Sequence, residues 1–81
     1  MVSGAALEFV EASSADAAAI SAFAIRTYVA AFGADMNPDD LALYLDRKLS
    51  VPRWLEYLAR DRVLLARIAG EIAGYVQFGP A

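Results

Sequence analysis

The last third of the chain constrains the fold most. Two almost continuously apolar runs, residues 63–69 and 72–78, flank Gly70 and Glu71, a pair that predicts a tight turn. Apolar residues at nearly every position are typical of strands covered on both faces rather than of a half-exposed sheet edge. Gly74, inside the second run, predicts a β-bulge or the close approach of a helix. The sequence therefore predicts a β-hairpin in the interior of a sheet.

Residues 13–60 carry the signals of helices. Ser13 and Asp16 have the spacing of a capping box, and Gly33 is typical of the first residue after a helix, so a first helix is expected over about 14–32. Apolar and small residues recur at every third or fourth position along it. The side expected to be buried comprises Ile20, Phe23, Ala24, Thr27, Tyr28 and Ala31.

Asn37 and Pro38 are the sharpest local signal in the chain. An Asn side chain caps a helix, and Pro is tolerated at the first helical position because no amide donor is needed there. The two residues predict a second helix that ends near Leu49, and Ser50 is expected to start a third helix over about 51–60. The buried side of that third helix is expected to comprise Trp54, Leu55 and Leu58.

A short strand over residues 6–12 is predicted to precede the helices. Leu7 and Phe9 alternate with Glu8 there, and Val10 interrupts the alternation. The predicted order is one strand, three helices and two strands, in a single domain over residues 1–81. We therefore expect an α+β fold in which helices pack on a three-stranded antiparallel sheet.

Composition excludes several classes of site. The 81 residues include no Cys and no His, which excludes disulfides, thiolate nucleophiles, His-based catalytic pairs and Cys- or His-ligated metal sites. Ten acidic and seven basic residues give a net charge of −3 without a basic patch, so no nucleic-acid partner is predicted.

Residues 15–34 are the most apolar stretch, but Asp16 and Arg26 interrupt it, and no basic residue precedes Arg26. Neither a membrane span nor a signal peptide is expected, and a cytoplasmic location is predicted.

Few residues qualify as candidates for chemistry. Asp39 and Asp40 are neighbours, but adjacent helical positions do not face each other, and helix capping explains both carboxylates. Four aromatic residues form either a pocket wall or ordinary core between helices and sheet: Tyr28, Phe32, Tyr44 and Trp54. Residue types and spacing identify no catalytic residue, no metal site and no self-contained active site.

Three runs of sequence share their order and spacing with a known superfamily. They read ASSAD at 12–16, TYVAAF at 27–32 followed by NPDDLALYL at 37–45, and GEIAGYV at 70–76. With them the chain resembles the N-terminal half of the GCN5-related N-acetyltransferase (GNAT) superfamily, and it is similar to the bacterial branch that acetylates spermidine and spermine. The resemblance spans essentially the whole chain and implies the β-α-α-α-β-β half of a GNAT fold.

The resemblance also implies a function. Members transfer an acetyl group from acetyl-CoA to an amine, and their first two helices shape the groove for the amine. By that resemblance Tyr28, Phe32 and Tyr44 line an acceptor site, and Asp39 and Asp40 attract a polyamine.

One part of the family's pattern is missing from the sequence. Members continue into a fourth strand and a Gly-rich [QR]-x-x-G-x-[GA] loop that holds the pyrophosphate of acetyl-CoA, whereas this sequence stops at Ala81 without that loop. The expected function is that of a GNAT-related N-acetyltransferase fragment that is inactive by itself and holds no cofactor alone. The alternative is a non-enzymatic dimeric module, derived from the same fold, that binds a ligand or a partner.

The last strand is expected to offer an unpaired edge. Apolar residues make up 59% of the chain, more than a monomer of this size readily buries, and an open strand edge is a template for pairing with another chain. We therefore expect a homo-oligomer through this edge, or a complementing C-terminal half. The residues expected at the interface are Ile72, Tyr75, Val76 and Phe78.

Overall fold

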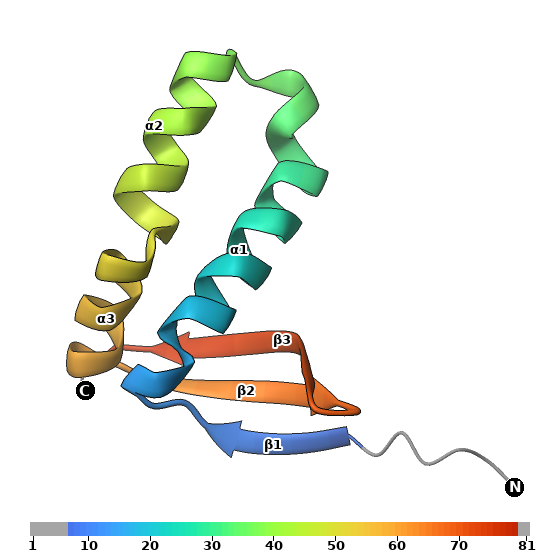
Figure 1. Cartoon of the computed structure of the whole chain (residues 1–81), viewed down its shortest axis with the longest axis vertical. Coiled ribbons are helices and arrows are strands. Elements are labelled where there is room, and N and C mark those ends of the chain that lie inside the picture. Colours follow the sequence, from blue (N-terminus) through green and yellow to red (C-terminus); the bar gives the residue numbers. More distant parts are fainter. Residues whose placement is uncertain (1–6, 80–81) are drawn as a thin grey trace, which may run out of the picture.

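The computed structural model of the protein describes residues 7–79 (Figure 1). Strand β1 is followed by three helices and then by a hairpin, which is the predicted order. The elements are β1 (Leu7–Glu11), α1 (Ala17–Phe32), α2 (Pro38–Leu49), α3 (Val51–Arg60), β2 (Arg62–Ile68) and β3 (Glu71–Phe78), with short 3-10 turns at Ser14–Asp16 and Gly33–Asp35.

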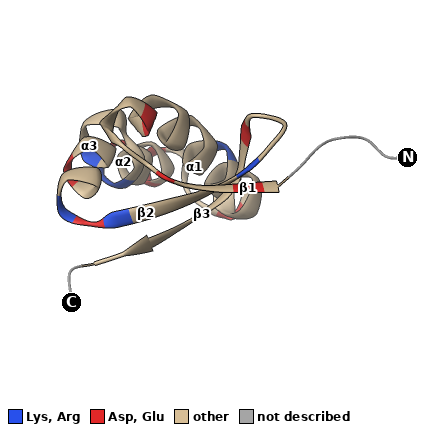
Figure 2. Cartoon of the chain, turned by 90° about the horizontal axis from the view of Figure 1, so that it is seen from below, with Lys and Arg blue, Asp and Glu red and all other residues tan. Residues whose placement is uncertain are grey.

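The three strands form one antiparallel sheet in the order β1-β2-β3. The predicted α+β class with a three-stranded antiparallel sheet is thereby confirmed. The helices lie together on one side of the strands (Figure 2). Helices α1 and α2 rise side by side from the sheet as a helical hairpin, while α3 and the first half of α1 lie close to the strands (Figure 1). Among residues 7–79, nothing covers the opposite face of the sheet.

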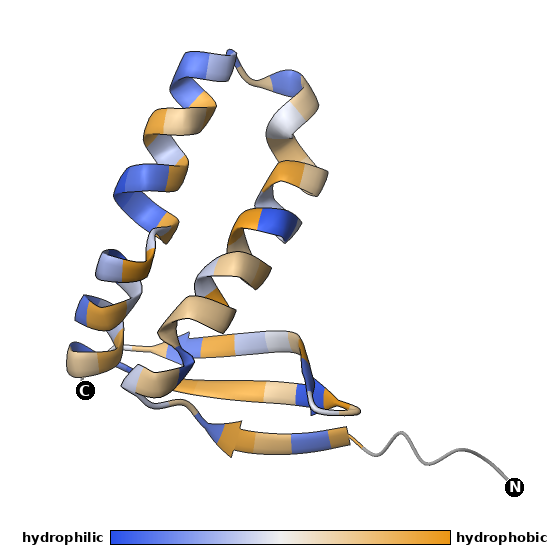
Figure 3. Ribbon diagram, in the orientation of Figure 1, coloured by the Kyte–Doolittle hydropathy of each residue, from blue (hydrophilic) through white to orange (hydrophobic). Residues whose placement is uncertain are grey.

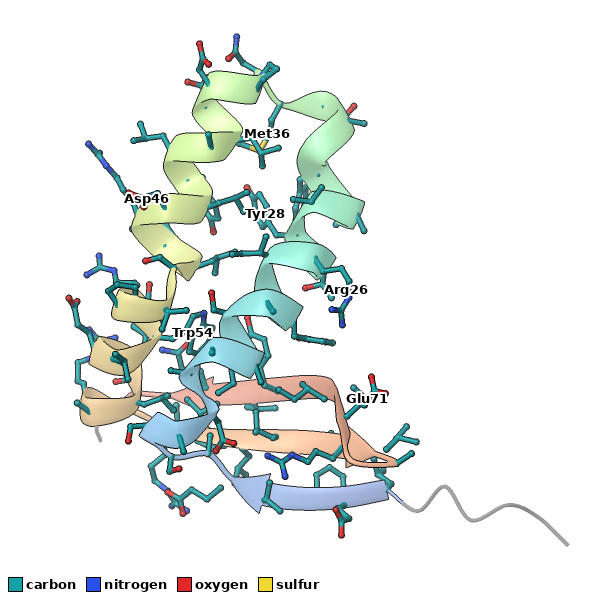
Figure 4. All side chains as sticks on the ribbon, in the orientation of Figure 1. Arg26, Tyr28, Met36, Asp46, Trp54 and Glu71 are labelled. Atoms are coloured by element: carbon teal, nitrogen blue, oxygen red, sulfur yellow. The ribbon has the colours of Figure 1, made fainter. Side chains whose placement is uncertain are left out.

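A small apolar core lies between the sheet and the two helices that contact it. Alternation along β2 turns Val63 and Leu65 toward the helices, where both are fully buried. Trp54 fills the space between α3 and α1 (Figure 4). The complete set of buried apolar residues is Ala17, Ile20, Ala24, Trp54, Val63 and Leu65.

The face of β1 that packs against the core is not the face that its alternation of apolar and acidic residues predicts. Val10 pairs with the buried Leu65 and packs against the core, although in the sequence it interrupts the alternation. Leu7 and Phe9 point to the uncovered face of the sheet and are exposed. The prediction that the strands are covered on both faces is therefore wrong for the described residues, since the helices cover one face only.

The β2–β3 hairpin is confirmed, with its turn one residue earlier than predicted. Ile68 pairs with Glu71, so the two turn residues are Ala69 and Gly70. Their φ angles of 54° and 80° are those of a type I′ turn, which matches the twist of the flanking strands. Gly70 provides this conformation without strain.

The β-bulge predicted at Gly74 is confirmed beside that residue. Ala66 pairs with Gly74 and Arg67 pairs with Ile72, which leaves Ala73 without a partner on β2. The alternative, close approach of a helix, does not occur. No atom lies within 4 Å of the position that a Cβ on Gly74 would take.

The predicted helix starts are confirmed by hydrogen bonds. The Asn37 side chain accepts from the amides of Asp39 at 2.8 Å and Asp40 at 3.4 Å, and α2 begins at Pro38. Before α1, the Asp16 carboxylate accepts from the Ser13 amide at 2.8 Å, which is one half of the predicted capping box.

Three predictions about helix residues are wrong. Thr27 and Ala31, expected on the buried side of the first helix, are exposed, because the second half of α1 extends beyond the sheet (Figure 1). Gly33 has a right-handed φ of −60° and continues into a 3-10 turn, so it is no left-handed helix terminator. It is small because a Cβ there would lie 3.1 Å from the Val29 side chain. Leu55 is exposed, because Tyr57, three residues after Trp54, takes its place against the core.

The segment Ser14–Asp35 is long and apolar enough, by length and composition alone, to cross a membrane. A core helix passes the same test, and in this structure Ile20 and Ala24 of that segment are buried in the core. The segment is therefore weak evidence for a membrane role.

We predict that Leu65→Ala lowers the free energy of unfolding by about 2–5 kcal/mol, because it leaves a cavity in the fully buried centre of β2. Urea denaturation followed by circular dichroism measures this change. Leu55→Ala is the matched control, since it removes the same atoms from an exposed position and is expected to cost less than about 1 kcal/mol. Equal losses in the two variants would contradict the position of the core.

The connection between α3 and the sheet generates a pH prediction. Arg60 donates to both carboxylate oxygens of Asp61 at 2.8 Å, and the Gln77 amide donates at 2.7 Å, which ties the end of β3 to this connection. The hydrogen bonds from Arg60, and next those from Gln77, lower the pKa of Asp61 from 3.8 to about 2. The folded-state pKa of Asp61 lies below its unfolded-state pKa. The contribution of Asp61 to the free energy of unfolding is therefore fully present above about pH 4 and is lost as the pH falls toward 2.

Thermal unfolding between pH 5 and 2 tests this contribution (about the range over which an Asp titrates). We expect Asp61→Asn to flatten the decrease in melting temperature in the lower half of that range. A variant whose melting temperature falls in parallel with that of the unmodified protein would contradict the role of Asp61.

Candidate functional site between α1 and α2

The three aromatic residues predicted to line an acceptor site come together between α1 and α2. Tyr28 of α1 points toward α2 (Figure 4) and stacks on Tyr44, with ring centroids 4.3 Å apart and planes 14° apart. Phe32, one turn after Tyr28, lies 4.9 Å from it at 45°. The rings therefore join the two helices, and the exposed part of Phe32 remains available to a ligand.

Met36, which the sequence analysis did not single out, completes this aromatic cluster. The Tyr28 hydroxyl donates to the Met36 sulfur at 3.4 Å. Met36 belongs to the connection between the helices, so its contact with Tyr28 depends on how the chain turns there. No periodic signal in the sequence predicts that contact.

A shallow hollow of about 290 Å³ lies along α2 next to the aromatic cluster. Asp40, Tyr44 and Lys48 follow each other at intervals of four residues, which places them in one stripe on the helix. The hollow thus combines a carboxylate, an aromatic ring and basic groups. Its lining residues are Met36, Asp40, Leu43, Tyr44, Arg47 and Lys48.

The two predicted acidic residues lie in different surroundings. Asp40 lines the hollow, whereas Asp39 does not. Both carboxylates stand in the first turn of α2, where the helix dipole favours negative charge. Capping therefore explains Asp39 fully, while Asp40 also contributes charge to the hollow.

A second hollow, of about 320 Å³, lies between α1 and the β2–β3 turn. Arg26, Arg67 and Glu71 bring charges of both signs to it, and Arg26 lies above Glu71 on the same side of the molecule (Figure 4). Arg67 pairs with Asp16 at 3.0 Å. The sequence analysis did not single out Arg67, although its alternation with Val63 and Leu65 places it on the helix side of β2.

The predicted interface residues divide between the two faces of the sheet. Ile72 and Tyr75 pack against the core on the helix side, and burial raises the pKa of the Tyr75 phenol. Val76 and Phe78 lie on the uncovered face and are exposed. Strand β3 lies at one edge of the sheet, as the predicted open edge requires.

Two of the three helix N-termini are poorly suited to the pyrophosphate of acetyl-CoA. That group needs free amides at a helix N-terminus and the absence of competing negative charge. At α2 the side chain of Asn37 occupies the first amides, Pro38 has none, and two carboxylates follow. Asp16 precedes α1 and adds negative charge there. The N-terminus of α3 differs, because the Ser50 side chain caps no amide and Arg47, Lys48 and Arg53 line a hollow beside it. No group of three potential metal ligands occurs among residues 7–79.

No protein-family model matches the chain, and no curated protein matches it. Function is therefore inferred from the geometry of the described residues and from the resemblance given above. The hollow beside Tyr44 contains one carboxylate, from Asp40, and two basic side chains, from Arg47 and Lys48.

A double-mutant cycle tests whether the aromatic cluster holds α2 in place. We predict a coupling of about 0.5–1.5 kcal/mol between Tyr28→Leu and Tyr44→Leu, because stacked rings stabilise each other beyond their burial. Urea denaturation of the two single variants and the double variant measures it. The control pair is Tyr28→Leu with Phe9→Leu, whose residues lie on opposite sides of the sheet and are expected to be additive within about 0.5 kcal/mol. Additivity in both pairs would contradict the stacked arrangement.

Proposed function

We propose that the chain is the acceptor-side half of an N-acetyltransferase related to the GNAT superfamily, and that it binds a cationic amine in the hollow beside Tyr44. The observation that carries this proposal is the position of Asp40 and the Tyr44 ring in one hollow. Two further features support it. The strands run in the antiparallel 1-2-3 order that the resemblance requires, and α1 and α2 stand together above the sheet.

The physical basis of the binding is charge and an aromatic face. An ammonium group is attracted by the Asp40 carboxylate and by the π face of an aromatic ring. Met36 and Leu43 offer apolar contacts to the methylene groups between the charges of a polyamine. Arg47 and Lys48 line the end of the hollow away from Asp40 and repel cations there. This repulsion favours an orientation in which the ammonium group lies near Asp40.

The role assigned to the described residues is binding of the acceptor, not transfer of the acetyl group. The sequence contains no Gly-rich [QR]-x-x-G-x-[GA] loop, so under this proposal the donor is held by other residues or by another polypeptide. In that arrangement the helical hairpin of α1 and α2 presents the amine, and the acetyl group comes from the complementing part.

A second candidate function is a non-enzymatic module that binds a ligand or a partner and dimerises. One observation favours it: the sheet has one uncovered face with exposed apolar side chains. The two candidates differ in what they require of the hollow. The acceptor half needs an amine there, whereas the module does not.

Calorimetric titration with spermidine at low ionic strength tests the acceptor site. We expect saturable binding that Asp40→Asn weakens about two- to fivefold, the effect of removing one exposed ionic contact. Asp46→Asn is the matched control, because it removes the same charge from the same helix outside the hollow, and it is expected to have a smaller effect. Thermal melts show that both variants remain folded.

Two outcomes would overturn the proposal. Absence of saturable heat leaves the non-enzymatic module as the better account. Equal weakening by Asp40→Asn and Asp46→Asn means that spermidine responds to the net charge and not to the hollow. A parallel titration with acetyl-CoA is expected to give no saturable heat, and saturation there would contradict the assignment of the donor to other residues.

A further inference from the structure

The uncovered face of the sheet gathers five of the ten large exposed apolar side chains of the described chain. Alternation along the strands sends to it the residues that do not face the helices. Figure 3 shows apolar colour on all three strands. The large exposed residues on this face are Phe9 (70% exposed), Leu7 (54%), Val76 (54%), Ile68 (43%) and Phe78 (43%).

A knob and a hole lie in one row across this face. Phe9 of β1 pairs with Ala66 of β2, and Ala66 pairs with Gly74 of β3, so side-chain size falls along the row from a phenyl ring to a methyl group to none. The strand at Gly74 thus forms the floor of an apolar hollow of about 400 Å³. The lining includes Phe9, Leu64, Ala66, Gly74, Val76 and Phe78.

We propose that a second copy of this chain stacks on the uncovered face, with Phe9 of each copy inserted over Gly74 of the other. In a two-fold symmetric interface, a contact from residue i to residue j is repeated from j to i. A two-fold axis that runs along β2 between the stacked sheets brings β1 of one copy over β3 of the other. Because Phe9 and Gly74 share a row, each phenyl ring then meets the position without a side chain.

The alternative in-plane axis does not fit the same row. A two-fold axis perpendicular to the strands brings β1 over β1. When this axis crosses the row of Phe9 and Gly74, the Phe9 rings oppose each other and the hollows over Gly74 also oppose each other. Packed sheets lie about 10 Å apart, a gap that one phenyl ring facing a glycine fills and two opposed rings overfill. The knob and the hole therefore select the axis along β2.

The size of the face agrees with a symmetric dimer. An aromatic side chain buries about 150–250 Å², so the five exposed residues, two of them Phe, offer on the order of 500–600 Å² of apolar surface. This is at the upper limit of the largest patch on ordinary monomers, about 300–600 Å². A standard interface buries roughly 800 Å² per partner, so this apolar surface would supply the larger part of one.

The charged side chains at the edge of this face do not oppose its burial against a second copy. Glu11 and Arg62 lie at one end of it and pair with each other at 3.2 Å, so stacking leaves neither of them without a partner. An apolar centre with a charged rim is the usual composition of a specific interface. This surface is on the opposite side of the sheet from the amine hollow, and the inference is independent of the proposed function.

Sedimentation equilibrium of the full chain tests the interface. We expect a dimer, and we expect Phe9→Ser to weaken it about 100-fold or more, because the symmetric dimer loses two buried phenyl rings. Gly74→Phe is expected to abolish it by filling the hole. The Gly74 backbone has an ordinary φ and open space around it, so this substitution leaves the fold of the monomer intact. Leu55→Ser, at an exposed position on α3, is the control and is expected to leave the dimer unchanged.

The exchanged variant Phe9→Gly with Gly74→Phe is the decisive measurement. It places the knob on β3 and the hole on β1, so the same two-fold axis restores each contact and the dimer is expected to re-form. Dimers that survive Phe9→Ser would assign self-association to another surface, such as the open edge of β3. A chain that stays monomeric at high concentration, or that forms only a complex with a different polypeptide, would overturn the proposal.

Discussion

The inner face of β2 is the surface against which the rest of the structure packs. Val63 and Leu65 are fully buried there, together with Ile20 of α1 and Trp54 of α3. A core of this size supports a domain of fewer than a hundred residues only narrowly. Hydrogen bonds at the ends of the elements supplement it, such as the bond from the Ser21 hydroxyl to the Leu49 carbonyl at 2.6 Å.

None of the residues of helix α2 is fully buried, and its contact with this core is made by Leu49 at its end. The helix is held by the stack of Tyr28 on Tyr44 and by its connections to α1 and α3. Segments with few buried contacts open at low free-energy cost, and ligand sites are often found in such segments. The part of the molecule that carries the candidate amine hollow is therefore distinct from the part that determines stability.

The two faces of the sheet differ in what they contact. The helix side is the folding core, whereas the opposite side has nearly as many apolar residues and nothing among residues 7–79 to cover it. A face of this kind favours association, since burying its side chains in a partner releases the same hydration free energy that drives folding. The proposed symmetric dimer satisfies that face without using the edge of β3.

The sequence by itself determined the local structure of this protein. Asn37 and Pro38 started α2 as predicted, and the apolar runs around Gly70 formed the hairpin, because capping and turn conformations depend on neighbouring residues. The helical positions of Tyr28 and Tyr44 were also predictable, and only the packing of α1 beside α2 brought their rings into a stack.

Tertiary structure alone decided which apolar residues are buried. Phe9 and Val10 are adjacent and both apolar, yet Val10 faces the core and Phe9 faces away, because pairing with β2 fixes the side to which each one points. For a similar reason Leu55, expected to be buried, is exposed, and Tyr57 packs against the core. A pattern of two or more apolar residues in succession is compatible with either face, and only the register of the strands and the placement of the helices select one.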